Sequence, residues 1–365
     1  MSGAIRRLST AALLAASRRL FNGAAETDAP FPHHELLRPH TSGRRYTAAH
    51  WNVVIPDLPA PHRFLGCAVI VGRPGMRAFD LDHAVVGSPR TTLTLAAGTA
   101  ATAPDWFSAY HVRDDCDLHA DGSRLRIADA LTITGAFPTY RIQLRRPGFA
   151  LDVEAECADR ITRFIRSPIY DHLGYPATYR GTLHWREQST PIEGLLSLEY
   201  ARISSTTAII DRPVPRALKL PIDVFTWQVI KLGPSTLLML AAMGVGTDLA
   251  TAAYLKDLGG QDHRYVRGVR LDVLDYHDQP VIAPDGAATR LPRRFRWLIP
   301  TASPTELIVT TDTHVIYGLG RGWIGGVDYE GTHEGRPVAG SAYYEYVGPR
   351  TALPGHPREK AQRVR

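Results

Sequence analysis

The chain has 365 residues, of which 44% are hydrophobic, and a formal net charge of +6. This length predicts two domains, and the composition is that of a folded globular protein rather than a disordered or fibrous one. The charge is concentrated at the ends, with +4 in residues 1–25 and +3 in residues 351–365, which leaves the remainder near −1. We therefore expect no nucleic-acid-binding surface on the folded body.

The N-terminal 45 residues read as a tail that is disordered or loosely helical. The first 25 residues contain four arginines and no acid, a composition shared with organellar transit peptides, and the sequence leaves that alternative open. No segment contains the ~20 consecutive apolar residues of a membrane span. We expect a cytoplasmic protein, in a weak membrane-peripheral association at most, through its basic tail.

The cysteines and histidines of the sequence do not have the spacing of a metal site or a disulfide framework. The three cysteines, Cys67, Cys116 and Cys157, are odd in number and far apart, so we expect buried thiols in a reducing compartment. The histidines of Pro30–Arg45 lie among prolines without further ligands at metal spacing, which favours a solvated linker. We predict no metal and no organic cofactor.

Short alternating runs separated by turn residues begin at Trp51–Ile55 and continue at Phe64–Val71 and Arg90–Leu95. This rhythm is typical of an all-β sandwich or barrel rather than of alternating βα units. The segment Asp248–Leu258 could form a strand or a short helix stopped by Gly259, and we favour the strand. The segment Arg160–Tyr179 does not alternate and contains two prolines and a glycine, so we expect a long ordered loop.

The clearest early hairpin is Thr139–Cys157, which turns at Pro147-Gly148. Its alternation predicts that Arg145 pairs with Ala150, Gln143 with Asp152 and Arg141 with Glu154. One face is then apolar and the other carries a cross-strand ion pair.

The chain ends two segments in the same way. Pro191-x-x-Gly194-x-x-x-x-Glu199-Tyr200 recurs as Pro337-x-x-Gly340-x-x-x-x-Glu345-Tyr346. Upstream, Leu183-His184-Trp185 is aligned with Val327-Asp328-Tyr329. The starts also match, as Trp51-Asn52-Val53-Val54 and Trp227-Gln228-Val229-Ile230, which predicts an internal duplication. On this alignment Trp51 and Trp227 are equivalent core residues at the base of each unit.

We therefore expect five regions: a tail at 1–45, a first β domain at 46–205, a linker at 206–226, a second β domain at 227–348 and a basic tail at 349–365. The aromatic-led first strands and the Gly-x-x-x-x-Glu-Tyr ends resemble the lipocalin-like family of carotenoid 1,2-hydratases, with AttH-type proteins and tocopherol cyclases as relatives. The closest match is Gly340–Gly348. The resemblance implies an all-β fold of two tandem antiparallel β-barrels of the calycin type, with a lipophilic small molecule between or inside them.

The sequence also departs from the hydratases. In the family that this sequence resembles, the acid chemistry looks to depend on a His-x-Trp pair and a Tyr-x-Asp pair. His-x-Trp does not occur here, because His184 and Trp185 are adjacent, and Tyr276-x-Asp278 lies in a segment that we expect to be a turn. Catalytic identity therefore does not carry over to this branch of the group.

The resemblance implies that an acid protonates a polyene, or that the pocket organises a cyclisation, with aromatic faces stabilising a cation. As catalytic candidates we name Asp171, His172, His184 and Asp328. As ligand-binding candidates we name Tyr170, Tyr175, Trp185, Trp323, Tyr329, Glu199 and Glu345; for the two glutamates a structural role at the barrel closure is favoured over catalysis.

Two functions stay open. The first is a hydratase, cyclase or isomerase that acts without a cofactor on an isoprenoid, polyketide or steroid-like compound. The second is a lipocalin-like carrier without catalytic activity. The clustering of Tyr170, Asp171 and His172 favours the enzyme, and the missing His-x-Trp pair favours the carrier.

Overall fold

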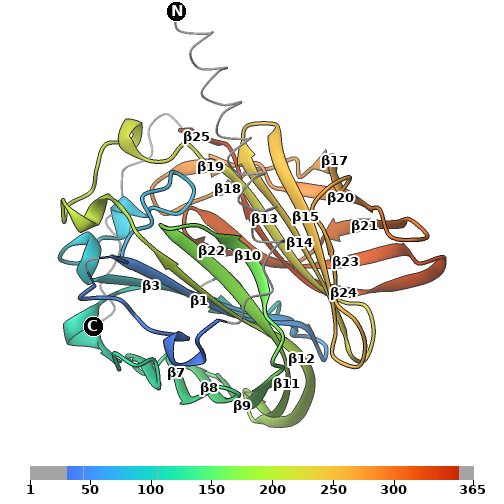
Figure 1. Cartoon of the computed structure of the whole chain (residues 1–365), viewed down its shortest axis with the longest axis horizontal. Helices are drawn as coiled ribbons and strands as arrows, with labels where there is room; N and C mark the ends of the chain where they lie inside the picture. Colours follow the sequence, from blue (N-terminus) through green and yellow to red (C-terminus); the bar gives the residue numbers. More distant parts are fainter. Residues whose placement is uncertain (1–30, 44, 105, 353–365) are drawn as a thin grey trace, which may run out of the picture.

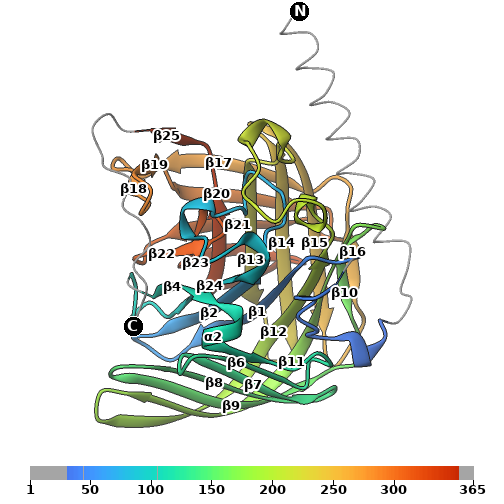
Figure 2. The same cartoon turned by 90° about the vertical axis from the view of Figure 1, so that its left-hand side faces the viewer.

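The computed structural model describes residues 31–43, 45–104 and 106–352, and the expected ends of the two tails lie outside these ranges. Two large antiparallel sheets dominate (Figures 1 and 2). The predicted fold of two tandem lipocalin-like β units is confirmed. The first sheet forms a nearly closed barrel and the second a half-barrel.

The first sheet has twelve strands. In spatial order they are β4 (Phe107–His111), β3 (Thr92–Gly98), β2 (Arg63–Val71), β1 (Ala48–Leu58), β12 (Gln188–Ile203), β11 (Tyr170–Trp185), β9 (Phe149–Cys157), β8 (Thr139–Arg146), β7 (Leu131–Ala136), β6 (Arg124–Ile127) and β5 (Cys116–Leu118), with β10 (Thr162–Arg166) also paired to β11. One short helix, α2 (Val112–Asp115), connects β4 to β5.

The second sheet has ten strands in a matching order. They are β16 (His263–Tyr265), β15 (Asp248–Asp257), β14 (Thr236–Val245), β13 (Val224–Lys231), β24 (Arg336–Val347), β23 (Gly322–His333), β21 (Thr305–Thr311), β20 (Pro292–Ile299) and β17 (Arg270–Tyr276), with β22 (Ile316–Leu319) paired to β23. A small third sheet contains β18 (Val281–Ile282), β19 (Ala287–Thr289) and β25 (Arg350–Ala352). Single 3-10 turns lie at His33–Glu35, Asp82–Ala84, Pro89–Thr91, Thr206–Ala208 and Arg216–Leu218. Among the described residues, no helix is long and apolar enough to cross a membrane.

Alternation along the central strands sorts the side chains into three cores. Trp51 and Tyr200 belong to a core inside the first sheet, and Tyr344 belongs to one inside the second. The third core lies between the sheets and includes Trp227 and Tyr343. The first strand of each unit pairs with the last strand of its closing hairpin, β1 with β12 and β13 with β24, and this places the repeated motifs at the centre of the molecule.

The two closing hairpins share cross-strand pairs, but with a different alignment from the predicted one. Gly194 lies opposite Tyr179, and Gly340 lies opposite Tyr329. The equivalent of Tyr329 is therefore Tyr179 and not Trp185. The prediction failed because the first strands of the two hairpins were aligned on a weak match of only three residues.

The first strands are also offset from the predicted alignment by one residue. Asn52 lies opposite Glu199, whereas Trp227 lies opposite Glu345. Since neighbouring residues on a strand face opposite sides, Trp51 points into the first sheet and Trp227 points between the sheets. The expected equivalence of the two tryptophans was wrong.

The hairpin of β8 and β9 has the predicted register, with Arg145 opposite Ala150 and Arg141 opposite Glu154. The ion pair is diagonal, however, because Arg141 binds Asp152. The strand expected at Asp248–Leu258 is confirmed as β15. The loop expected at Arg160–Tyr179 was wrong, since most of it forms β10 and the start of β11; pairing with β12 overrides the local turn signals.

The stretch 31–43, expected to be solvated, is packed against the first sheet. Phe31, Leu36 and Leu37 are buried, and the carbonyl of Leu37 accepts a hydrogen bond of 3.1 Å from Trp51 Nε1. Prolines and histidines in the sequence suggested a linker, but three apolar side chains gave the segment enough buried area to order it.

Glycines bring the two sheets into close contact. A Cβ on Gly66 of β2 would lie 2.5 Å from Cε2 of Tyr343 on β24, and one on Gly326 would lie 2.7 Å from Cδ1 of Phe64. Arg63 adds a polar link between the sheets. Its Nη1 lies 2.7 Å from Asp312 Oδ2, and its Nη2 lies 2.6 Å from Asp328 Oδ1. The second sheet is therefore held firmly against the outer face of the first.

Candidate functional site

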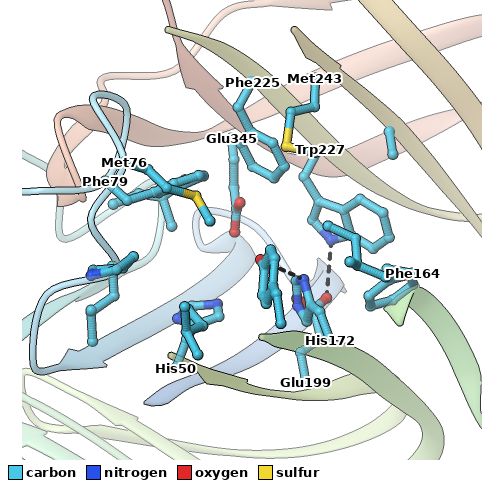
Figure 3. A pocket seen from close by; sticks show the side chains of 17 residues that line it. His50, Met76, Phe79, Phe164, His172, Glu199, Phe225, Trp227, Met243 and Glu345 are labelled. Atoms are coloured by element: carbon cyan, nitrogen blue, oxygen red, sulfur yellow. Dashed lines mark hydrogen bonds and ion pairs between the residues drawn. The ribbon is translucent and has the colours of Figure 1, made fainter. Parts of the chain in front are cut away.

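A pocket lies between the two sheets, lined by His50 of β1 and by side chains of β10, β11, β12, β13, β14 and β24 (Figure 3). Its lining residues are His50, Ile70, Pro74, Met76, Phe79, Phe164, Ile165, Tyr170, His172, Glu199, Ile203, Phe225, Trp227, Ala241, Met243, Leu319 and Glu345. Most are apolar or aromatic, and the few polar groups converge on one region. Such a lining is typical of a small-molecule site.

Strand alternation selects which side chains reach this pocket. On β11, His172 faces the pocket and Asp171 faces the opposite side. On β12, Glu199 faces the pocket, whereas Leu198 and Tyr200 belong to the core of the first sheet. A shift of one residue in any of these strands would remove the polar group from the site.

Glu199 and Glu345, the glutamates of the two repeated motifs, meet here. Trp227 Nε1 donates to Glu199 Oε1 at 3.0 Å, and Tyr343 donates its hydroxyl to Glu345 Oε1 at 2.6 Å. Between them, Asn52 Nδ2 donates to Glu345 Oε1 at 2.7 Å and approaches Glu199 Oε2 at 3.5 Å. The two carboxyl groups therefore share one amide as a bridging donor.

Burial decides the protonation of this pair. Burial raises the pKa of Glu199 well above its usual range, and the neighbouring Glu345 raises it further, against the opposing effect of the hydrogen bond from Trp227. Burial also raises the pKa of Glu345 to about 7. Two adjacent carboxyl groups in an apolar site resist double ionisation, so the pair retains at least one proton at neutral pH.

Two histidines complete the polar region. His50 Nδ1 lies 2.8 Å from the carbonyl oxygen of Val69, so Nδ1 carries the proton and Nε2 is left as an acceptor. Burial lowers the pKa of His50 to about 4, and burial followed by the proximity of His50 lowers the pKa of His172 well below its usual value. Both imidazoles are therefore neutral at physiological pH.

His172 Nε2 is buried without a hydrogen-bond partner and lies 3.9 Å from Glu199 Oε2. This distance is too long for a hydrogen bond, and both groups are neutral, so the contact is not an ion pair in the resting protein. A water molecule or a ligand hydroxyl between these atoms would satisfy both.

Aromatic rings form one wall of the pocket. Phe164 packs edge-on against Trp227 with 4.4 Å between ring centroids, and against His172 with 4.9 Å. The hydroxyl oxygen of Tyr170 lies 3.4 Å from His172 Nδ1. Ring faces beside a buried acid are suited to a ligand that becomes positively charged.

The free space is narrow. The volume open to the centre of a water-sized sphere is about 40 Å³, which is room for roughly three water molecules at about 10–15 Å³ each. Met76 lies beside Phe79 and Met243 beside Phe225 in the lining (Figure 3). Because methionine side chains are unbranched and adaptable, a larger ligand can be accommodated if they move.

The group of described residues most suited to a metal ion is His50, His172 and Glu199, whose ligand atoms lie within 4.8 Å of one another. In a tetrahedral zinc site with bonds of about 2.0–2.1 Å, the ligand atoms are only about 3.4 Å apart. The three side chains would have to move inward, and Glu199 would have to lose the proton that its surroundings favour. The arrangement is better suited to acid chemistry than to metal binding.

The structure brings four of the predicted site residues together: Tyr170, His172, Glu199 and Glu345. Asp171 is buried behind them, 2.5 Å from Arg163 and 3.2 Å from Arg202, in an ionic cluster. The strand geometry that exposes His172 to the pocket turns Asp171 away from it.

The other candidates lie elsewhere. His184 and Asp328 are exposed, and Asp328 binds Arg63. Tyr175 is in the core of the first sheet, and Trp185 packs beside that core under Arg186. Trp323 and Tyr329 are in the core of the second sheet.

Sequence reasoning missed His50, Asn52, Phe164 and the pocket-facing role of Trp227. For the first two a signal was present, because His50, Asn52 and Val54 alternate with the apolar Trp51 and Val53 on one strand. For Phe164 no local signal was available, since only the packing of the second sheet shows which segment covers it.

Fold and site together define a lipocalin-like protein of two β units with a buried carboxyl pair between them. Residues 68–362 match the family of unknown function DUF6670, and the chain belongs to this family. No curated protein sequence matches the chain.

Three solved structures share the fold. A protein of Nitrosomonas europaea assigned to AttH is 14% identical, with a TM-score of 0.58 over 88% of this chain and 97% of that one. Kievitone hydratase from Nectria haematococca is 8% identical, with a TM-score of 0.54 over 88% and 94%. CghA is 11% identical, with a TM-score of 0.50 over 91% and 97%. These likenesses confirm the resemblance at the level of the fold alone.

Proposed function

We propose that this protein binds a lipophilic small molecule between its two sheets and that Glu199 donates a proton to it. The observation that carries the proposal is the pair of buried carboxyl groups, Glu199 and Glu345, in an otherwise apolar and aromatic pocket. A carboxylic acid that stays protonated at neutral pH is the group that alkene protonation requires. The structural likeness to kievitone hydratase gives a hydratase fold as context and no more.

In the reaction class that this site suits, Glu199 gives its proton to one carbon of a carbon–carbon double bond. The π electrons form the new C–H bond, and the adjacent carbon becomes a cation beside the rings of Trp227 and Phe164. Water adds to the cation and returns a proton to the Glu199 carboxylate, which yields a hydrated product. Loss of a neighbouring C–H proton to the same carboxylate yields an isomerised product instead. If a second double bond of the ligand first attacks the cation to close a ring, proton loss from the new cation yields a cyclised product.

The neighbours of Glu199 have separate tasks in this scheme. Trp227 and Asn52 hold the carboxyl group in place through hydrogen bonds. Glu345 keeps the proton on Glu199 by disfavouring a second negative charge. Neutral His172 offers its unpaired Nε2 to orient a water molecule or a ligand hydroxyl.

The test begins with mass spectrometry of organic extracts from natively purified protein, followed by thermal shift with isoprenoid, polyketide and steroid compounds. Where a compound binds and is converted, Glu199→Gln should lower turnover by roughly 10²–10⁴-fold with little change in affinity. Glu193→Gln, an exposed position on the same strand, is the matched control. Conversion by Glu199→Gln at the parental rate would disprove the assignment, and binding without conversion by the parental protein would favour a carrier.

A further inference from the structure

The described residues with large, exposed apolar side chains are not spread evenly. Five of the eight lie at one end of the molecule, and this concentration sets that end apart. We name this set the apolar rim: Ile169, Ile209, Ile210, Leu218 and Leu220. Ile209 is 88% exposed and Leu218 is 68% exposed, the two highest values in the set. Exposed apolar residues that gather in one place mark interaction sites, whereas single ones need no explanation.

Backbone hydrogen bonds bring these residues together. Leu220 N donates to the carbonyl of Gly75 at 2.9 Å, and Arg77 N donates to the carbonyl of Leu220 at 3.0 Å. A Cβ on Gly75 would lie 3.4 Å from Ser205, at the start of the turn that leads to Ile209. Ser204 N donates to the carbonyl of Ile169 at 2.7 Å.

The apolar rim adjoins the pocket. Pro74, Met76 and Phe79 line the pocket, and the connection that carries them is the one held by Leu220. Ile203 and Tyr170 also line the pocket, and each directly precedes or follows a residue that anchors the rim, Ser204 and Ile169. In Figure 1 the segment 204–223, drawn in yellow-green, lies at the left-hand edge of the fold.

The charge around the rim is positive. Arg212 and Arg216 are exposed, and Arg77 is half-buried with Nε donating to the carbonyl of Arg216. Asp211 is the nearest acid in sequence; it accepts hydrogen bonds from Ser88 Oγ and the backbone N–H of Arg90 and offsets one of the three positive charges. Lys219 is buried and paired with Asp80 and Asp82, so it adds little to the field outside.

We infer that the apolar rim docks on the surface of an anionic lipid bilayer. Apolar side chains that enter the interface, surrounded by arginines that attract acidic headgroups, are the features of a peripheral membrane-binding surface. The position beside the pocket gives the docking a purpose, because a lipophilic ligand can pass from the bilayer to the site with little exposure to water. That purpose rests on the proposed function, whereas the docking itself does not.

The experiment is flotation of the purified full chain with phosphatidylcholine vesicles, with and without phosphatidylglycerol. We expect binding to the anionic vesicles and its loss at high salt. Arg212→Glu with Arg216→Glu should weaken binding by more than about 25-fold, because loss of each positive charge accounts for about fivefold and the added negative charges repel the headgroups. Ile209→Asp with Leu218→Asp should also abolish flotation. Leu274→Asp and Arg270→Glu on β17 are matched exposed controls that should leave it unchanged.

Several outcomes would overturn the inference. Wild-type flotation that the rim variants retain, and that is lost when Arg6, Arg7, Arg18 and Arg19 become glutamine, assigns the membrane contact to the N-terminal segment. Failure to float, together with self-association that Ile209→Asp removes, assigns the rim to a second copy of the chain.

A separate measurement keeps the two proposals distinguishable. Farnesol, an isoprenoid alcohol, is titrated while tryptophan fluorescence is followed, because Trp227 lies in the pocket wall. Ala241→Phe, which fills the pocket, should remove the saturable response and preserve flotation. The rim variants should preserve the response in detergent-free buffer. No farnesol response with normal flotation would count against the pocket proposal alone.

Discussion

Trp227 of β13 donates its indole N–H to Oε1 of Glu199 on β12 across 3.0 Å, so a side chain of the second sheet binds the buried acid of the first. Trp51, its predicted counterpart, makes its hydrogen bond to Leu37 instead and takes no part in the pocket. The acid site therefore exists only where the two sheets are packed together. Neither β unit contains it alone.

Trp227→Phe tests this relationship. The variant keeps the aromatic ring and removes the donor, so we expect a loss of about 1–3 kcal/mol in the free energy of unfolding. The pKa of Glu199 should rise further, since the lost hydrogen bond favours the ionised form. Urea unfolding measures the first effect and the pH dependence of ligand binding the second. Trp51→Phe should destabilise to a similar extent yet leave the pH dependence unchanged.

The carboxyl pair should make the protein less stable as the pH rises. A group whose pKa is raised on folding binds its proton more tightly in the native state, so its contribution is complete below pH 4.5 and is lost as the pH passes the folded value. With the pKa of Glu345 raised to about 7, we expect a loss on the order of 3 kcal/mol between these values, at about 1.4 kcal/mol per pKa unit.

The measurement is the difference in unfolding free energy between wild type and Glu199→Gln with Glu345→Gln across this pH range. The histidines are present in both proteins, so their opposite contribution, which is lost as the pH falls below 6.5, largely cancels. A difference that stays constant with pH would show that the pair is ionised in the folded protein.

Asp171 is expected to be structural. Asp171→Asn takes the carboxylate away from the buried guanidinium group of Arg163 and from the half-buried one of Arg202, which keeps Glu35, and breaking a buried pair typically costs about 3–5 kcal/mol. Thermal or urea unfolding should detect this loss, whereas the folded variant should bind ligand normally. His184→Ala, at an exposed position, should change stability by less than about 0.5 kcal/mol. Loss of ligand conversion in folded Asp171→Asn would return this residue to the list of catalytic candidates.

Gly66→Ala tests the close contact between the sheets. The added methyl group would lie 2.5 Å from the ring of Tyr343, and overpacking of this kind costs about 1–3 kcal/mol. Because Tyr343 donates to Glu345, displacement of its ring should also alter the pKa of the carboxyl pair. Gly233→Ala is the matched control, with its nearest neighbour at 3.6 Å and no steric conflict. Equal stability of the two variants would contradict the contact.

The fold was readable from the sequence where local patterns are strong. The hairpin of β8 and β9 was predicted to the residue, because alternation over eight or more positions fixes which face is buried. The two closing motifs singled out Glu199 and Glu345, which both line the pocket. Their meeting in one pocket could not be predicted, since it depends on how the outer face of one sheet packs on the other.

The errors over Asp171 and over residues 160–179 have a common physical cause. Asp171 and His172 were treated as one cluster because they are adjacent in sequence, but a strand sends them to opposite sides. Trp51 and Asn52 are likewise neighbours on a strand and point to opposite sides of it. Because residues 160–179 were expected to form a loop, their side chains were not assigned to the two faces of a strand. The direction in which each one points could therefore not be predicted.

The glycine contacts between the sheets have a consequence for how a ligand would leave. With Gly66 against Tyr343 and Gly326 against Phe64, the halves cannot swing apart without breaking tight packing. We expect passage to depend instead on rotation of adaptable side chains in the lining, such as Met76 and Met243. A protein of this kind would retain a bound molecule through slow escape rather than through strong attraction, and residence time would respond to methionine substitutions more than equilibrium affinity does.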